Sequence, residues 1–244
     1  MAARLKYLLL QVRDEGDPMR TQEVDCFARA LECDGDDISV LDLLQAAPTA
    51  AHLAAVDGVL LGGSGDYGVT GGGDWLERAL DAMRELHARA KPTFATCWGF
   101  QAMAMALGGK VVSDLQRAEL GTLALELTAA GRADPVFGPL ADAGPSFLAQ
   151  VGHQDLVEHL PTDAVLLART ERAPHAFTFA SRAIYCTQFH PELDRATFLE
   201  RVRSYPQYVE QITGLPYAVF ESQHTRESPQ ANTLLARFRR VVLG

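Results

Sequence analysis

Short, nearly continuous apolar runs alternate with amphipathic stretches, and this alternation restricts the fold more than any other feature of the chain. A parallel sheet covered by helices on both faces requires such runs, because both sides of each strand are buried. Four runs are predicted to be strands: 5–12, 38–44, 58–63 and 93–97. Apolar spacing predicts helices between them, at 23–32, around 46–53 and at 74–90. The predicted fold class is α/β, with a single doubly wound, mostly parallel sheet flanked by helices, as in flavodoxin-like proteins.

The residue pattern changes between residues 108 and 183. Apolar and β-branched segments separated by Gly, Pro and Asp are typical of antiparallel strands and hairpins, so we expect a mixed or antiparallel flank on the sheet. After residue 192, helices are predicted at 195–203, 207–212 and 229–242. Since no internal repeat or linker is evident, we expect residues 1–195 to form the domain and residues 196–244 to be a C-terminal helical extension packed on it.

The charge balance argues against several classes of function. The 244 residues include 22 basic and 31 acidic side chains, a formal charge of −9, whereas nucleic-acid binding needs clustered Lys and Arg. No stretch approaches the roughly 20 apolar residues of a membrane span. We therefore expect a soluble, cytoplasmic protein. The four cysteines lack CxxC spacing, so no disulfide framework is expected and a thiol is free to act as a nucleophile.

The glycine-rich segment GDYGVTGGG (65–73) follows the third predicted strand. It lacks the spacing of a phosphate-binding loop, in which Lys follows the last glycine. A flexible active-site rim or a plain connection from strand to helix explains the segment better, and both interpretations stay open.

Cys97 lies where a predicted strand meets a predicted helix, with Ala95 before it and Gly99 after it. Small residues at these positions are typical of a nucleophile elbow, a sharp turn that holds the nucleophile in a strained conformation at the carboxyl edge of a sheet. The helix N-terminus also favours a thiolate, through its free amide groups. The same spacing fits a cysteine that is simply a small buried apolar residue.

A second candidate motif is CTQFHPEL (186–193), in which a predicted strand leads into His190 and Glu192. A cysteine nucleophile needs a base, and a carboxylate bonded to the far imidazole nitrogen fixes the tautomer of that base. Since one residue separates the two, both side chains can point the same way from the strand end. Taken alone, the tripeptide HPE is also typical of a helix entry.

In combination, the motifs resemble those of a known family. FATCWGFQAMAMALGG (94–109) followed by CTQFHPEL is similar to the class I glutamine amidotransferases, and GVLLGGSGDYG (58–68) resembles their strand-end glycine pair. A third block, ELGTLALELTAAGRADPVFGPL with VGHQDLVEHLP, most resembles the amidotransferase domain of GMP synthetases and its free-standing relatives. The resemblance covers about residues 5–195.

The resemblance implies a catalytic role for three residues. Cys97 would be the nucleophile, His190 the general base and acid, and Glu192 the residue that orients His190. The reaction implied is hydrolysis of a γ-glutamyl amide through a thioester, which needs no metal or organic cofactor. The seven histidines also show no HExxH or paired ligand spacing.

Further site residues follow from the same resemblance. The backbone amides of Gly62, Gly63 and Trp98 would form the oxyanion hole. Gln101 would contact the substrate amide. The region of His153 would line the glutamine pocket, mainly through its backbone, although a hydrogen-bonded structural histidine explains His153 equally well.

The chain departs from the family beside the nucleophile. Many members have Gly-Ile-Cys-Leu-Gly-His-Gln where this chain has ATCWGFQ (95–101). The rings of Trp98 and Phe100 are expected to reshape the pocket or to block it. Both glutamine and γ-glutamyl compounds therefore remain candidate substrates.

Three functions are compatible with these motifs. The first is a glutaminase that releases glutamate and delivers ammonia to a separate acceptor or synthetase chain. The second is a γ-glutamyl peptide hydrolase or transferase that uses the same triad. The third is a catalytically weak regulatory or binding subunit, against which the intact triad counts. Homo-oligomerisation stays open, as does the role of residues 196–244.

Overall fold

The computed structural model describes residues 4–244, and its first strand, β1 (Tyr7–Val12), is buried along its whole length. Strand β1 pairs in parallel with β2 (Ile38–Asp42) and β3 (Gly58–Ser64). Strand β3 pairs in parallel with β4 (Thr93–Thr96), and β4 with β11 (Arg182–Thr187). Four of these five strands, β1 to β4, match the predicted apolar runs, and β11 matches the strand predicted before His190.

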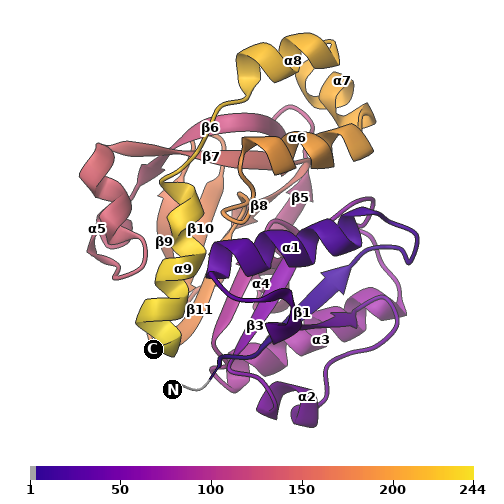
Figure 1. Cartoon of the computed structure of the whole chain (residues 1–244), viewed down its shortest axis with the longest axis vertical. Helices are drawn as coiled ribbons and strands as arrows, with labels where there is room; N and C mark the ends of the chain where they lie inside the picture. The colour runs from indigo at the N-terminus through magenta and orange to yellow at the C-terminus, as the bar shows by residue number, and fades with distance from the viewer. Residues whose placement is uncertain (1–3) are drawn as a thin grey trace.

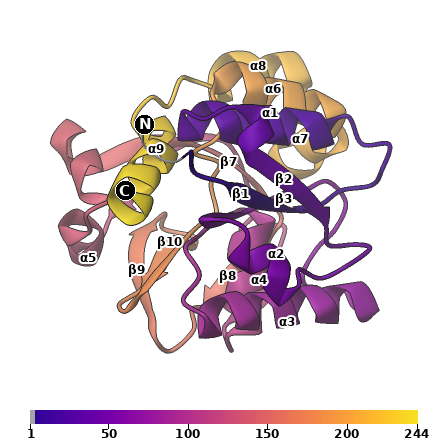
Figure 2. The same ribbon diagram turned by 60° about the horizontal axis from the view of Figure 1, so that its bottom comes forward.

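Side chains of the parallel strands enter two separate cores, because successive residues of a strand face opposite sides. In β1, Leu8 and Leu10 belong to one core, and Tyr7 and Leu9 to the other. Figure 2 shows the helices that cover the two faces. One face carries α2 (Ala50–Ala54), α3 (Asp74–Ala88) and α4 (Trp98–Ala106), and the other carries α1 (Met19–Leu31) and α9 (Leu234–Phe238).

An antiparallel flank continues the sheet beyond β11. The order is β10 (Pro174–Phe179), β9 (Ala164–Arg169), β6 (Glu119–Leu127) and β7 (Ser146–His153). Helix α5 (Ala129–Ala133) lies between β6 and β7 in the chain. Strands β5 (Lys110–Ser113) and β8 (Asp155–His159) form a separate two-stranded ribbon. The predicted fold class, a mostly parallel sheet with a mixed or antiparallel flank, is confirmed.

The C-terminal residues form more helices than the sequence indicates. Helices α6 (Arg195–Ser204) and α7 (Gln207–Thr213) match the prediction, and Figure 1 shows them with the unpredicted α8 (Tyr217–His224) at one end of the molecule. The helix predicted at 229–242 is partly wrong. A 3-10 turn, α9 and a π-helical turn occupy residues 231–243 instead. No helix in the described part of the chain is both long and apolar enough to cross a membrane.

Tertiary hydrogen bonds set the start of this last helical segment. Asn232 donates from its side-chain amide to the carbonyls of Pro191 (2.9 Å) and Leu193 (2.8 Å), which flank Glu192. These contacts hold the segment to a loop far away in the sequence, and local propensity does not encode them. Further along, α9 places Phe238 in the core, with its ring centroid 5.4 Å from that of Phe94 and 5.8 Å from that of Tyr185.

Replacement of Phe238 by Ala tests whether the extension belongs to the same cooperative unit as the sheet. We expect Phe238→Ala to lower the free energy of unfolding by about 3–5 kcal/mol, because a fully buried aromatic ring leaves a cavity. Urea unfolding followed by far-UV circular dichroism and by tryptophan fluorescence measures this. A single shifted transition supports one unit, whereas loss of the C-terminal helices before the sheet would contradict it.

Close packing between α4 and β3 gives a second test. A Cβ on Gly99 would lie 2.5 Å from the Cβ of Leu61 and 3.2 Å from that of Ala95. We expect Gly99→Ala to destabilise the fold by about 1–3 kcal/mol, since the helix must move off the sheet. Gly72→Ala is the control, because nothing lies within 4 Å of its added Cβ. Equal midpoints of thermal unfolding in the two variants would refute this explanation.

Candidate active site

Cys97 occupies the sharp turn between β4 and α4. Its φ of 50° and ψ of −101° lie in a region that L-residues with side chains rarely adopt. The turn is held from both sides, since the Cys97 amide donates to the carbonyl of Thr187 (2.8 Å) and its carbonyl accepts from the amide of Gln101 (3.1 Å). The strained elbow that the sequence indicates is therefore present. The thiol is half-buried and donates to the carbonyl of Gly152 at 3.5 Å.

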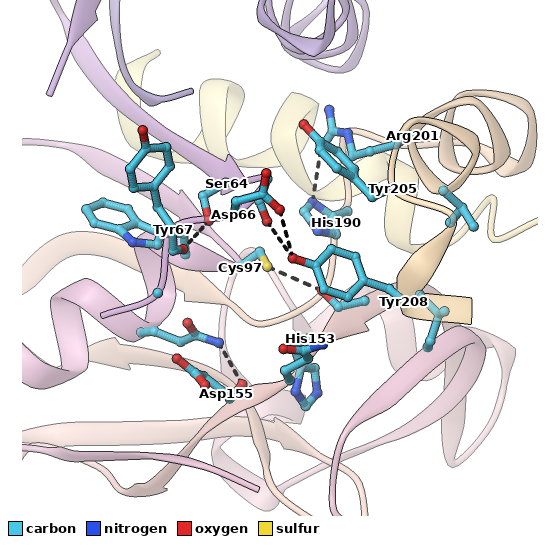
Figure 3. Close-up of a pocket in the computed structure, with 18 of the residues that line it drawn as sticks. Ser64, Asp66, Tyr67, Cys97, His153, Asp155, His190, Arg201, Tyr205 and Tyr208 are labelled. Carbon is cyan, nitrogen blue, oxygen red and sulfur yellow. Dashed lines mark hydrogen bonds between the residues drawn. The ribbon is translucent and has the colours of Figure 1, made fainter. Parts of the chain in front are cut away.

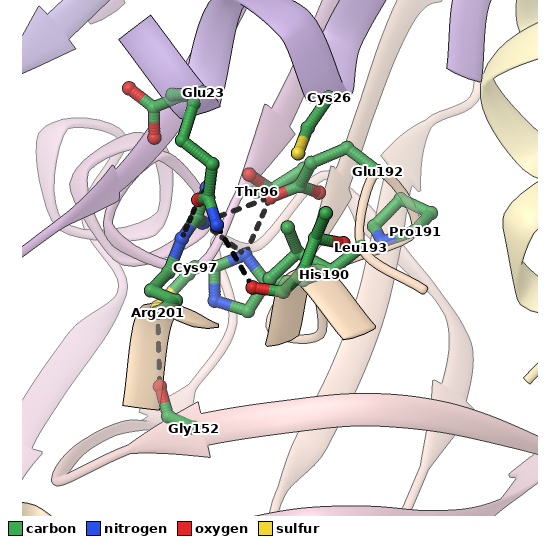
Figure 4. Close-up of polar contacts among 12 residues, drawn as sticks. Glu23, Cys26, Thr96, Cys97, Gly152, His190, Pro191, Glu192, Leu193 and Arg201 are labelled. Atoms are coloured by element: carbon green, nitrogen blue, oxygen red, sulfur yellow. Dashed lines mark hydrogen bonds and ion pairs between the residues drawn. The ribbon is translucent and has the colours of Figure 1, made fainter. Parts of the chain in front are cut away.

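His190 and Glu192 follow β11 in a buried loop. The imidazole Nδ1 lies 2.7 Å from Glu192 Oε1, and the backbone amide of His190 donates to the carbonyl of Gln150 at 2.9 Å. Figure 4 shows the pair among its polar neighbours. With Nδ1 bonded to the carboxylate, Nε2 is left as the nitrogen that can exchange a proton with a reacting group.

The two turns meet because β4 and β11 are adjacent parallel strands that end at the same edge of the sheet. Gly63, at the end of β3, marks the meeting point. A Cβ placed on Gly63 would lie 3.0 Å from His190 Cε1 and 3.7 Å from Cys97 Cβ. The structure thus brings together Cys97, His190 and Glu192, although more than ninety residues separate the first from the others.

The pKa values of His190 and Glu192 are shifted in opposite directions. Burial lowers the pKa of His190, but the charges of Glu192 and Cys97 raise it, to about 9. Burial raises the pKa of Glu192, whereas His190 and Arg201 lower it, and the net value lies below the ordinary one. An imidazolium at neutral pH beside an ionised carboxylate can donate a proton to a departing group.

A cavity of about 350 Å³ opens over Cys97 and His190 (Figure 3). The glycine-rich segment 65–73 forms one wall, as expected for an active-site rim. Its position is fixed by the hydroxyl of Tyr208, which donates to the carbonyl of Gly65 (3.1 Å) and to Asp66 (3.2 Å). The C-terminal extension forms the opposite wall, with Phe198, Arg201, Val202, Tyr205, Tyr208 and Ile212.

Gln101 and His153 both line the cavity, and both are held by other residues. The amide nitrogen of Gln101 donates to the carbonyl of Asp155 (2.7 Å) and to Gln188 Oε1 (3.1 Å). His153 Nε2 lies 3.3 Å from Glu119 Oε2, and the imidazole is fully buried. The contact with Glu119 is the kind that the structural interpretation of His153 predicts, and the side-chain carbonyl oxygen of Gln101 is a hydrogen-bond acceptor.

The predicted oxyanion-hole residues lie beside the elbow. A Cβ on Gly62 would lie 2.2 Å from the Oε1 atom of buried Glu23, so any side chain there would displace that carboxylate. Trp98 is the first residue of α4, where amide groups have no partner within the helix. Its indole packs on Trp75, with ring centroids 6.1 Å apart.

Phe100 lies fully buried against Phe177 and does not line the cavity, so its ring leaves the site open.

His153 also belongs to a group of metal-ligand type: Glu119, His153 and His175 offer ligand atoms within 4.8 Å of one another. These atoms already contact each other, since His175 Nε2 lies 2.7 Å from the same Glu119 oxygen that His153 approaches. Metal-binding histidines usually donate their second nitrogen to a partner, yet within residues 4–244 neither Nδ1 has one. The geometry favours a hydrogen-bonded support for β7. Sequence spacing does not indicate it, because three separate strands supply the residues.

Several cavity residues have no local signal in the sequence. Arg13 follows β1, is fully buried and pairs with Glu23 at 3.2 Å and Asp17 at 3.1 Å. Arg201 and Tyr205 come from the extension. A lone Arg or Tyr next to a strand or on a helix is ordinary, so only the packing of distant segments identifies these residues as part of the site.

Comparisons with curated proteins point to the same family as the motifs. The GMP synthase of Edwardsiella ictaluri is 38% identical over 105 residues, which make up 42% of this chain and 20% of that protein. The gamma-glutamyl peptidase 3 of Arabidopsis thaliana is 29% identical over 157 residues, 64% of this chain and 62% of the peptidase. The chain thus matches only about a fifth of the length of the GMP synthase.

Solved structures share the fold. A glutamine amidotransferase from Thermotoga maritima aligns with a TM-score of 0.76 at 19% identity, over 99% of this chain and 100% of the other. A second glutamine amidotransferase, from Methylobacillus flagellatus, gives 0.69 at 18% identity, over 98% and 95%. The family described as "Glutamine amidotransferase class-I" matches residues 27–201, well over half of the chain. The resemblance seen in the motifs is confirmed, and the chain belongs to the class I glutamine amidotransferase family.

Proposed function

We propose that this chain hydrolyses the γ-amide of glutamine with Cys97 as nucleophile, His190 as general base and acid, and Glu192 as the group that orients His190. One observation carries the proposal. A cysteine in a strained elbow and a His–Glu pair bonded at 2.7 Å end adjacent parallel strands at one cavity. This is the arrangement that nucleophilic catalysis by a thiol requires.

In the proposed cycle, the Cys97 thiolate attacks the γ-carbonyl carbon. The amides of Trp98 and of Gly62 and Gly63, near the end of β3, stabilise the oxygen as it becomes negative. His190 then donates a proton to the nitrogen, the carbon–nitrogen bond breaks, and ammonia leaves. A water molecule gives a proton to His190 and attacks the thioester, which releases glutamate and restores the thiolate.

A separate synthetase that accepts ammonia is the partner we propose. The GMP synthase relative supports this, since its name describes a glutamine-hydrolysing synthase and the match covers 20% of that protein. The nitrogen would then be used on another chain or domain.

A γ-glutamyl peptide is the second candidate substrate. A cavity of about 350 Å³ falls within the range of about 300–1,000 Å³ for sites that hold drug-sized ligands. Phe198, Val202 and Ile212 of the extension give it an apolar wall suited to an attached residue. The similarity to gamma-glutamyl peptidase 3 also favours this candidate.

Replacement of the proposed nucleophile tests the chemistry. We expect Cys97→Ala to reduce release of glutamate from L-glutamine, or from a γ-glutamyl dipeptide, by at least roughly 10³-fold, because no thioester can form. Glutamate is quantified by a coupled dehydrogenase assay on both substrates. Cys33→Ala is the control, since Cys33 is outside the cavity lining.

The substrate that is turned over distinguishes the candidates. Cys97-dependent hydrolysis of glutamine supports the glutaminase, and hydrolysis of the dipeptide alone supports the peptidase. If neither substrate is turned over and a glutamine-analogue electrophile fails to alkylate Cys97, the chain is a non-catalytic subunit.

The pH dependence gives a separate test of His190. Since its pKa is raised to about 9, the imidazolium needed to protonate the leaving group persists until the pH approaches 9. We expect kcat/KM to fall above that pH. Protonated His190 also stabilises the fold. Its contribution to the free energy of unfolding is fully present below about pH 6.5 and is lost as the pH rises through 9.

The Glu192→Gln variant provides the comparison for this profile. It removes the carboxylate charge that raises the pKa of His190, so the fall in kcat/KM should move to lower pH by roughly 1 unit or more. An unchanged profile would show that His190 does not titrate in the reaction.

A further inference from the structure

Arg201, on helix α6 of the extension, lies against the proposed catalytic pair. Its Nη1 is 3.4 Å from Glu192 Oε1 and 3.5 Å from His190 Nδ1. The side chain is 9% exposed, and Figure 4 shows it beside both residues. Burying a cation costs free energy unless a specific partner compensates the charge. The partners of Arg201 therefore decide what its charge does.

The guanidinium is held in place by a neutral group. Gln22 Oε1, on α1, accepts from Arg201 Nε (3.1 Å) and Nη2 (3.0 Å). Gln22 in turn donates to the carbonyl of Thr197 (3.0 Å) and to Glu200 (2.9 Å), both on α6. The amide fixes the orientation of Arg201 and leaves its charge unneutralised.

The charge is therefore directed at Glu192. Among residues 4–244, Glu192 is the one carboxylate within 4.0 Å of Arg201. The same oxygen, Oε1, accepts from His190 at 2.7 Å. One carboxylate oxygen is thus shared by an imidazole and a guanidinium, and the guanidinium also repels a positive charge on the imidazole.

We propose that Arg201 is a positioning residue for the cysteine hydrolase, which holds Glu192 Oε1 against His190 Nδ1 and limits how strongly the carboxylate retains the proton of the imidazole. This inference rests on the proposed function. The reaction cycle requires this, because His190 must give a proton to the departing amide nitrogen as well as take one from water. An imidazole bound to an unshared buried carboxylate would release its proton less readily.

Other groups around Arg201 do not supply this effect. Arg13 is matched by its own carboxylates, Glu23 and Asp17. Burial raises the pKa of Cys26 to about 11, and it raises the pKa of Tyr205 still further above its ordinary value, so both are neutral near pH 7. Besides Arg201, the groups whose charge acts on the imidazole are Glu192 and Cys97.

The test is titration of His190 by NMR in protein with ¹⁵N-labelled histidine, with His190→Gln used to assign the resonance. We expect Arg201→Met to raise the pKa of His190 on the order of 1 unit, because a repelling charge is removed. Arg201→Lys, which keeps the charge, should stay within about half that shift. Arg203→Met is the matched control, since Arg203 is exposed on the same helix and lies outside the cavity lining.

Kinetics separate positioning from substrate binding. We expect Arg201→Met to lower kcat by roughly 10- to 100-fold with little change in KM, and Arg201→Lys to restore most of the loss. A rise in KM alone would assign Arg201 to substrate binding and overturn the proposal. So would an unchanged pKa of His190 in folded Arg201→Met.

Arg201→Gln keeps hydrogen-bonding atoms near Gln22 and takes the place of the Met variant if the latter does not fold; the same rise in the pKa of His190 is expected. The titration needs no substrate. Absence of hydrolysis by the wild type would therefore refute the proposed function, while the effect of Arg201 on the pKa of His190 could still be measured.

Discussion

The parallel pairing of β4 with β11 is the interaction on which the proposed site depends. Thr96 lies opposite Thr187, and the amide of Cys97 donates to the carbonyl of that same threonine. Parallel strands end at a common edge, so the turns that follow them face each other. A shift of register by one residue would turn the strand side chains to the opposite face and separate the two turns. Cys97 and His190 therefore meet only if the sheet forms in this register.

The C-terminal extension acts on both the core and the cavity. Phe238 of α9 packs between Phe94 and Tyr185 in the sheet. Helices α6 and α7 supply one wall of the cavity, and Tyr208 of α7 bonds to the glycine-rich rim, 143 residues away in the chain. The extension is therefore built into the site, which accounts for the presence of Arg201 beside a motif that ends at Leu193.

Much of this protein could be predicted from the sequence, because the relevant signals are local. Continuous apolar runs indicate strands buried on both faces, and small residues around Cys97 indicate a sharp, strained turn, in which the structure gives Cys97 a φ of 50°. The pair His190 and Glu192 is separated by a single residue, so its geometry follows from the strand end. Helix boundaries in the extension were less predictable, since contacts such as those of Asn232 with a distant loop decide them.

Only the tertiary structure decided which distant residues complete the site. Arg13, Arg201 and Tyr208 carry no motif, and they reach the cavity because strand pairing and helix packing bring segments as much as 192 residues apart into contact. The Glu119 cluster depends in the same way on the positions of β6, β7 and β10 in the sheet. Sequence determined the chemistry available along the chain, since residue type and local spacing set turns, strands and paired side chains. The fold determined how that chemistry is oriented and charged, because electrostatic effects depend on distances through space and on exclusion of water.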